Sequence, residues 1–223
     1  MKINFLYHFF IHIFALIKNI SMKNSFKLFD FKGTPVYLKY WFFILLLLGV
    51  NTFVTLFIAV LIHELAHAYM AKRLNHPVDY IYLDAFNGAA MIDTTYSSCK
   101  DTILITIVGP ISNLLLYGVG YFLLNSGFEN YTLNSFLSVF CNINMILFIF
   151  NMLPIYPMDG GRISKAICQY FTKPSIGRKI NGYISIITSL LLLVFSLFSN
   201  MIILAIFCIF FIYIGYTEIK QKY

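Results

Sequence analysis

The chain has 223 residues, of which 60% are hydrophobic and only 11% are charged, and its net charge is +7. Soluble globular domains carry about 25% charged residues, so this composition argues against an ordinary water-soluble globule. The 24 Phe, 16 Tyr, 12 Gly and 6 Pro exclude disorder and collagen-like repeats. Apolar runs near the length that crosses about 30 Å of hydrocarbon recur along the chain. We therefore predict an integral membrane protein.

Six apolar runs are predicted to cross the membrane as helices, over residues 36–50, 53–72, 102–124, 135–153, 181–198 and 201–217. Residues 3–17 are also apolar but too short to span comfortably. We expect them to lie along the interface as an amphipathic helix, with a seventh span as the alternative. The predicted fold is an α-helical, six-span polytopic bundle. It is divided into an amino-terminal interfacial segment (1–35), a membrane core (36–217) and a cytoplasmic tail (218–223).

The 16 Lys and Arg residues indicate the orientation of this bundle. They gather in alternate gaps between the apolar runs, including the basic loop 158–180, whereas the other gaps contain none. This is the positive-inside pattern, which places both ends of the core and the basic loops on the cytoplasmic side. The positive charges do not form one basic face, so we expect no nucleic-acid partner.

The second run contains three polar residues in five positions, His63, Glu64 and His67, in the pattern HExxH. A charge at the centre of a span costs about 2.5–3.5 kcal/mol on the insertion scale, so these residues require a reason. Residues four apart on a helix share one face, so the two imidazoles can bind one metal ion. Glu64, about 100° around the helix, can reach a metal-bound water without ligating the metal. The alternative is a pair of core histidines that satisfy each other or a neighbouring hydroxyl.

Asp159 is the strongest candidate for the third protein ligand that a catalytic zinc site needs beside its open water position. It stands in the segment NMLPIYPMDGGR, which starts at Asn151. Pro154 and Pro157 stop a helix there, and irregular backbone at membrane depth is tolerated only where protein or a water-filled cavity covers it. The segment can therefore bring this carboxylate to a buried site. The alternative is a Pro-rich turn in which Asp159 caps the next helix.

The segment after the second run predicts a small β-hairpin. Two strand-like runs, 80–86 and 89–96, flank Asn87-Gly88, and Asn-Gly between such runs is a strong hairpin signal. A substrate helix must unwind before its carbonyls can be attacked, and an exposed strand edge holds an extended peptide by main-chain hydrogen bonds. We expect this hairpin to clamp the substrate. The alternative is a surface hairpin that only joins two spans.

The HExxH motif in one span, combined with NxxPxxPxDGGR after a later one, resembles the site-2 protease family (M50) of intramembrane zinc metalloproteases. The likeness covers about residues 36–217 and is nearest to the compact bacterial branch that includes the sporulation-type pro-sigma-factor protease. That branch usually carries a carboxy-terminal CBS domain, whereas this sequence ends at Tyr223. The resemblance implies a multi-pass protein of the cell membrane, and we expect a bacterial source.

The same resemblance implies one Zn2+ ion, held by His63, His67 and Asp159, with Glu64 as the catalytic base. The implied reaction is hydrolysis of a peptide bond within or next to a transmembrane segment of a membrane-bound protein. The substrate-binding residues implied or expected are Asn151 and Pro157, which match family positions for substrate contact, and Phe86, Asn87 and Gly88, which loosely resemble a family hairpin.

Two further features leave alternatives open. Gly109-Pro110, followed by Asn113, is similar to a family element in the third span; we expect it to kink that helix for packing, with a role in opening for substrate as the alternative. Asn142 and Asn144 either line a water path to the metal or form interhelical hydrogen bonds.

A different function, a membrane metal transporter or metal-binding protein, would use the same ligands. Transporters commonly show internal repeats and polar residues through several spans, and neither is seen.

Overall fold

The computed structural model describes residues 24–84, 89–92, 97–127 and 130–221. Its elements in chain order are β1 (Ser25–Phe31), β2 (Thr34–Lys39), the 3-10 helix η1 (Tyr40–Leu48), α2 (Val50–Arg73), β3 (Val78–Leu83), β4 (Ala89–Ile92), α3 (Cys99–Leu124), α4 (Tyr131–Met152), α5 (Asp159–Phe171), α6 (Pro174–Phe198) and α7 (Ile202–Lys220).

Five of these helices, α2, α3, α4, α6 and α7, are long and apolar enough to cross a membrane. They correspond to the second through sixth predicted runs, so the multi-pass character is confirmed. The 24 residues of α2 extend about 36 Å at 1.5 Å per residue, enough for the hydrocarbon layer. The short helix α5 has only 13 residues and lies between α4 and α6 along the chain.

The predicted spanning helix over residues 36–50 is wrong. That segment instead forms strand β2 followed by η1. A short apolar run fits a strand or a helix equally well by hydrophobicity alone. The strand forms here because β1 and β3 supply hydrogen-bonding partners on both sides. The side chains of Val36 and Leu38, two positions apart, are both buried.

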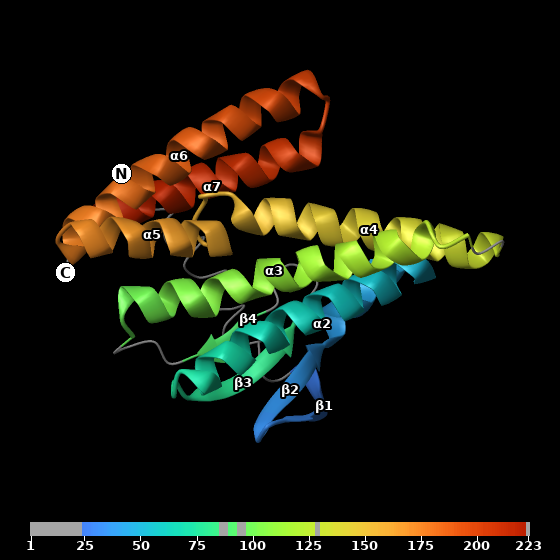
Figure 1. Ribbon diagram of the computed structural model, residues 1–223. Coiled ribbons are helices and arrows are strands. Elements are labelled where there is room, and N and C mark those ends of the chain that lie inside the picture. Colours follow the sequence, from blue (N-terminus) through green and yellow to red (C-terminus); the bar gives the residue numbers. More distant parts are fainter. Residues whose placement is uncertain (1–23, 85–88, 93–96, 128–129, 222–223) are drawn as a thin grey trace.

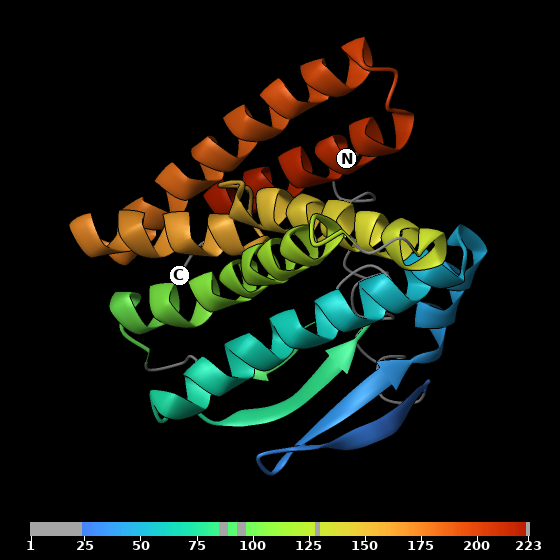
Figure 2. The same cartoon turned by 45° about the vertical axis from the view of Figure 1, so that its right-hand side comes forward.

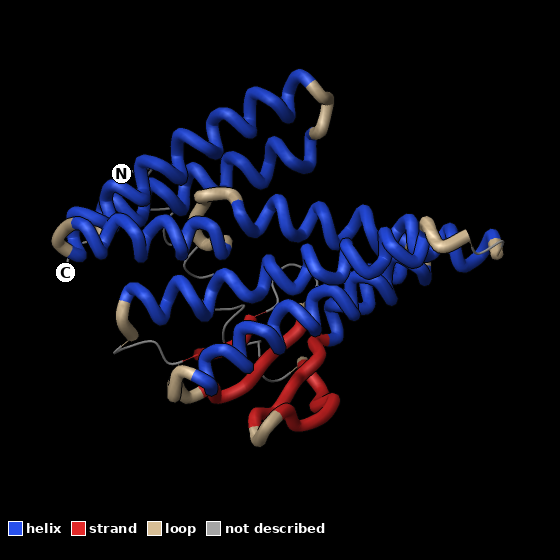
Figure 3. The backbone as a smooth tube through the Cα atoms, in the orientation of Figure 1, coloured by secondary structure: helices blue, strands red, loops and turns tan. Residues whose placement is uncertain are grey.

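One four-stranded sheet, in the order β1-β2-β3-β4, lies against α2 (Figure 3). β2 pairs with β3 in parallel, and the two outer pairs are antiparallel. The sheet contacts the helix through Val36, Ala68 and Ile81, none of which has exposed surface. The predicted β3–β4 hairpin is confirmed, although β1 and β2 enlarge its sheet. The hairpin tip, with Phe86, Asn87 and Gly88, lies outside the described residues.

The elements stack in layers, with the α6–α7 pair on one side of the molecule and the sheet on the other (Figures 1 and 2). Between them lie α2 and α3 in the half nearer the sheet, and α4 and α5 nearer the α6–α7 pair. Contacts of α3 with α2, α4 and α5 hold these layers together. This arrangement brings the middle of α2 close to the start of α5, which are the two predicted sources of metal ligands.

Candidate metal centre

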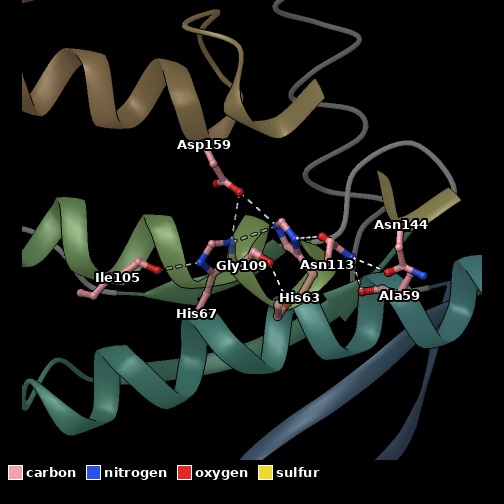
Figure 4. Close-up of polar contacts among 9 residues, drawn as sticks. Ala59, His63, His67, Ile105, Gly109, Asn113, Asn144 and Asp159 are labelled. Atoms are coloured by element: carbon pink, nitrogen blue, oxygen red, sulfur yellow. Dashed lines mark hydrogen bonds and ion pairs between the residues drawn. The ribbon is translucent and has the colours of Figure 1, made fainter. Parts of the chain in front are cut away.

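The three predicted ligands meet inside the bundle. The Nε2 atoms of His63 and His67 lie 3.0 Å apart, and Oδ2 of Asp159 lies 3.0 Å from the first and 3.3 Å from the second. Each of these residues is only 7% exposed. Figure 4 shows both imidazoles rising from one face of α2 toward the carboxylate at the start of α5. The structure therefore assembles three metal-binding side chains from positions far apart in the sequence.

The other ring nitrogen of each histidine, Nδ1, lies within hydrogen-bond distance of an oxygen atom. Nδ1 of His67 lies 2.7 Å from the backbone oxygen of Ile105, which can only accept, so this nitrogen carries the hydrogen. Nδ1 of His63 lies 2.6 Å from Oδ1 of Asn113. In the neutral imidazole only one ring nitrogen is protonated. With the hydrogen on Nδ1, each Nε2 presents a lone pair to the centre of the site.

The orientation of the Asn113 amide is fixed by its other contacts. Its Nδ2 donates to Oδ1 of Asn144 at 3.1 Å and to the backbone oxygen of Ala59 at 3.4 Å. Asn144 in turn donates to the backbone oxygen of Phe140 at 2.9 Å. Because both backbone oxygens only accept, the chain has one direction, and Oδ1 of Asn113 must face His63. Of the two alternatives for Asn144, interhelical hydrogen bonding is therefore the one observed.

The donor set fits a zinc ion. Two imidazole lone pairs and a carboxylate oxygen converge, and Oδ2 of Asp159 is buried without a hydrogen-bond partner among the described residues. Three acceptors in one buried space repel one another unless a cation lies between them. Tetrahedral zinc ligands at about 2.0–2.1 Å from the metal lie about 3.3 Å apart, close to the separations of 3.0–3.3 Å found here. A tetrahedral zinc held by these three side chains would keep its fourth position for water.

Gly109 in α3 leaves the space that this site needs. A Cβ atom at this position would lie 2.3 Å from Nε2 of His67 and 2.8 Å from Nε2 of His63. Even alanine would therefore collide with the metal-binding atoms. Helix α3 continues through Pro110, so the observed role of the Gly-Pro pair includes this close approach to the histidines.

The loop between α4 and α5 is partly covered by protein, as its prolines predict. Ile155 has no exposed surface, and the backbone N–H of Tyr156 donates to Oγ of Ser185 in α6 at 3.0 Å. A Cβ at Gly160 would lie 2.3 Å from the backbone oxygen of Leu153, so the start of α5 packs directly on this loop. These contacts hold Asp159 in the first turn of α5, facing the histidines rather than solvent.

The structure also places the remaining predicted residues that lie within its described part. Glu64 is buried and follows His63 on α2. Burial, and next the negative charge of Glu64, raise the pKa of the Tyr82 phenol in β3. Asn151 is in the last turn of α4 and Pro157 is in the loop before α5; both are half-buried. Their roles, like that of Glu64, stay predictions.

Fold and site together define a class: a multi-pass membrane protein whose buried His, His and Asp side chains fit one zinc ion. The sequence profile of peptidase family M50 matches residues 126–195. Zinc metalloprotease MJ0392 of Methanocaldococcus jannaschii is 31% identical over 208 residues, covering 87% of this chain and 60% of that protein. Stage IV sporulation protein FB of Bacillus subtilis is 32% identical over 110 residues, covering 48% of this chain and 37% of that protein.

A solved structure extends the likeness to three dimensions. The site-2 protease from Methanocaldococcus jannaschii aligns with a TM-score of 0.63 at 27% identity, covering 89% of this chain and 97% of that chain. The chain spans about 60% of the length of zinc metalloprotease MJ0392. These likenesses all lie with the M50 site-2 protease family, the family that the two motifs indicate.

Proposed function

We propose that this protein is an intramembrane zinc metalloprotease that hydrolyses a peptide bond within or next to a transmembrane segment of a membrane-bound protein. The observation that carries this proposal is the buried convergence of His63, His67 and Asp159 beside Glu64. Polar groups at such depth in apolar helices are expensive, so a complete set of zinc ligands is better explained by chemistry than by packing.

The proposed reaction divides its roles among neighbouring residues. When bound, zinc supplies Lewis acidity for the peptide carbonyl and for the attacking water. Glu64 accepts the proton of that water and delivers it to the leaving amine. Asn113 and the backbone oxygen of Ile105 hold the two imidazoles in the tautomer that ligation requires.

The sheet supplies a surface for the unwound substrate. β4 ends the strand order, so it has an edge that no described strand occupies. A peptide added along this edge would be held in the extended form that hydrolysis needs. We propose that the hairpin, including Phe86, Asn87 and Gly88 at its tip, clamps the substrate, and that Asn151 and Pro157 contact it from the other side of the metal centre.

The orientation proposed from the positive charges does not depend on the first predicted helix, because Lys72 and Arg73 lie at the C-terminal end of α2 and the other basic loops follow at alternate helix ends. We propose that the basic loops are cytoplasmic, within the proposed division into 1–35, 36–217 and 218–223. A place in the bacterial sporulation-type branch stays a proposal, supported by a match that covers 48% of the chain.

The substitution Glu64→Gln tests the proposed function. It keeps the size and the zinc ligands but removes the base, so the purified variant is expected to hold zinc while the membrane no longer shows cleavage. Mass spectrometry of membranes that contain wild type or variant would identify the protein that accumulates uncut. Asp30→Asn, at an exposed position on β1 outside the proposed clamp, is the matched control. Unchanged cleavage by the Glu64 variant would eliminate this residue as the base, and zinc flux into proteoliposomes would favour a transporter.

A further inference from the structure

A second polar feature lies at the C-terminal end of α2, more than a turn beyond His67. A hollow of about 330 Å3 is lined by Lys32, Tyr69, Lys72 and Arg73, and we call it the basic hollow. Lys32 comes from the turn between β1 and β2, and the other three residues come from the last turns of α2. Its volume is near the low end of the roughly 300–1,000 Å3 typical of small-molecule sites. No step of the proposed reaction uses these side chains.

The cations of the basic hollow are held close together by contacts with uncharged groups. Nζ of Lys72 donates to the backbone oxygen of Lys32 at 2.5 Å, and Nζ of Lys32 stands 4.3 Å from the ring centroid of Tyr69. An ammonium group has three N–H donors, so these contacts leave donors of both lysines available to a ligand. The positive charges are therefore positioned but not neutralised.

No carboxylate of the described residues forms an ion pair with the three cations. The nearby Asp30 on β1 pairs with Lys27 at 2.7 Å. Residues 1–23, which are not described, contain neither Asp nor Glu. Three positive charges around one hollow, with no acidic partner in the described part of the chain, favour an anion as the occupant.

The backbone at Lys32 adds an independent observation. Lys32 has φ +49° and Gly33 has φ +80°, which is the left-handed conformation of a two-residue hairpin turn. Asn-Gly is the preferred pair in such a turn, and a lysine is disfavoured in this region of φ. Lysine is therefore an unfavourable choice for the backbone conformation of this turn. Its side chain nevertheless lines the basic hollow.

The location of the hollow indicates the source of the anion. It lies at the end of a membrane-length helix, where lipid headgroups meet water, and Tyr69 is 41% exposed beside it, as is typical of aromatic residues at this depth. Lys and Arg residues clustered at the cytoplasmic end of a transmembrane helix attract acidic headgroups. We infer that the basic hollow binds the phosphate of an anionic phospholipid headgroup in the leaflet next to the C-terminal end of α2.

The test measures lipid binding to the full-length protein in detergent by native mass spectrometry, with phosphatidylglycerol as the anionic probe and phosphatidylcholine as the zwitterionic one. Wild type is expected to retain phosphatidylglycerol preferentially. Lys32→Asn is expected to weaken this binding about fivefold without lowering thermal stability, because Asn-Gly suits the turn. Lys72→Gln combined with Arg73→Gln is expected to weaken it about 25-fold. Lys179→Gln removes an exposed cation of α6 outside the hollow and is expected to change binding less than twofold.

Two results would overturn the inference. The first is equal retention of phosphatidylglycerol by wild type and by both hollow variants. The second is complete displacement of the lipid by millimolar inorganic phosphate, which would identify a soluble anion, rather than a membrane lipid, as the occupant. Retention of the lipid in the presence of phosphate supports the headgroup assignment.

Discussion

Replacing Gly109 by alanine should destroy the metal centre through a single added methyl group. The new Cβ would lie 2.3 Å from Nε2 of His67, whereas ordinary contact begins near 3.4 Å. The imidazole must therefore move by about 1 Å, several times the roughly ±0.2 Å that a metal–ligand distance tolerates. We expect zinc affinity to fall at least about 100-fold, more than the loss of a supporting hydrogen bond usually costs.

Gly118→Ala provides the matched control, because a Cβ at Gly118 on the same helix has no atom within 4 Å. Alanine favours a helix over glycine by about 0.8–1.0 kcal/mol at either position, so the two variants differ only in the contact with the histidines. Zinc affinity is measured on detergent-solubilised protein by competition with a chromophoric chelator, and circular dichroism checks helix content. Wild-type affinity in the Gly109 variant, or an equal loss in the Gly118 variant, would refute this reasoning.

Three other outcomes are expected. Asn113→Leu should weaken zinc binding about 10–100-fold by removing the acceptor at His63, whereas Asn142→Leu, at an exposed position of α4, should leave the chelator titration unchanged; equal effects would contradict a positioning role. Asp84→Ala leaves Lys39 buried without its 2.8 Å partner and should cost about 3–5 kcal/mol. The same change at exposed Asp30 should cost about 0–1 kcal/mol, and similar melting temperatures for the two variants would count against the difference. Chelation of zinc should lower the melting temperature reversibly, and an unchanged temperature would show that the metal does not stabilise the fold.

The metal-binding residues could be predicted because each is anomalous in its context. His63 and His67 stand one helical turn apart in an apolar run, and Asp159 follows two helix-stopping prolines. Apolar membrane helices leave few explanations for such groups, so local chemistry was enough to identify them. The structure adds that the same residues converge within 3.3 Å.

The supporting residues could be recognised only as polar positions in apolar helices, apart from Asn113, which also belongs to an element that resembles the family. Asn113 and Asn144 are fully buried, but their hydrogen bond joins α3 to α4 across 31 positions of sequence. Ser185 likewise supports Tyr156 from another helix. A one-dimensional pattern shows that an asparagine in an apolar helix needs a partner, but not which helix supplies it.

The first apolar segment was mispredicted because hydrophobicity does not distinguish a covered strand from a membrane helix. β2 forms by pairing with β1 and with β3. In the second of these pairs, Val36 lies opposite Ile81, which is more than 40 positions further along the chain. Lys39 was the available signal: a lysine within the predicted span needs a buried partner, and Asp84 provides it. The β3–β4 hairpin, in contrast, rests on a local Asn-Gly signal and was predicted correctly.

X-ray absorption spectroscopy of zinc in the purified protein tests the central claim most directly. The account predicts one zinc per chain, with two imidazole nitrogens and oxygen ligands, and loss of the ion in the Asp159→Ala variant. A full zinc complement with an unchanged spectrum in that variant would contradict the assignment of this carboxylate as a ligand, and with it the proposed metal centre.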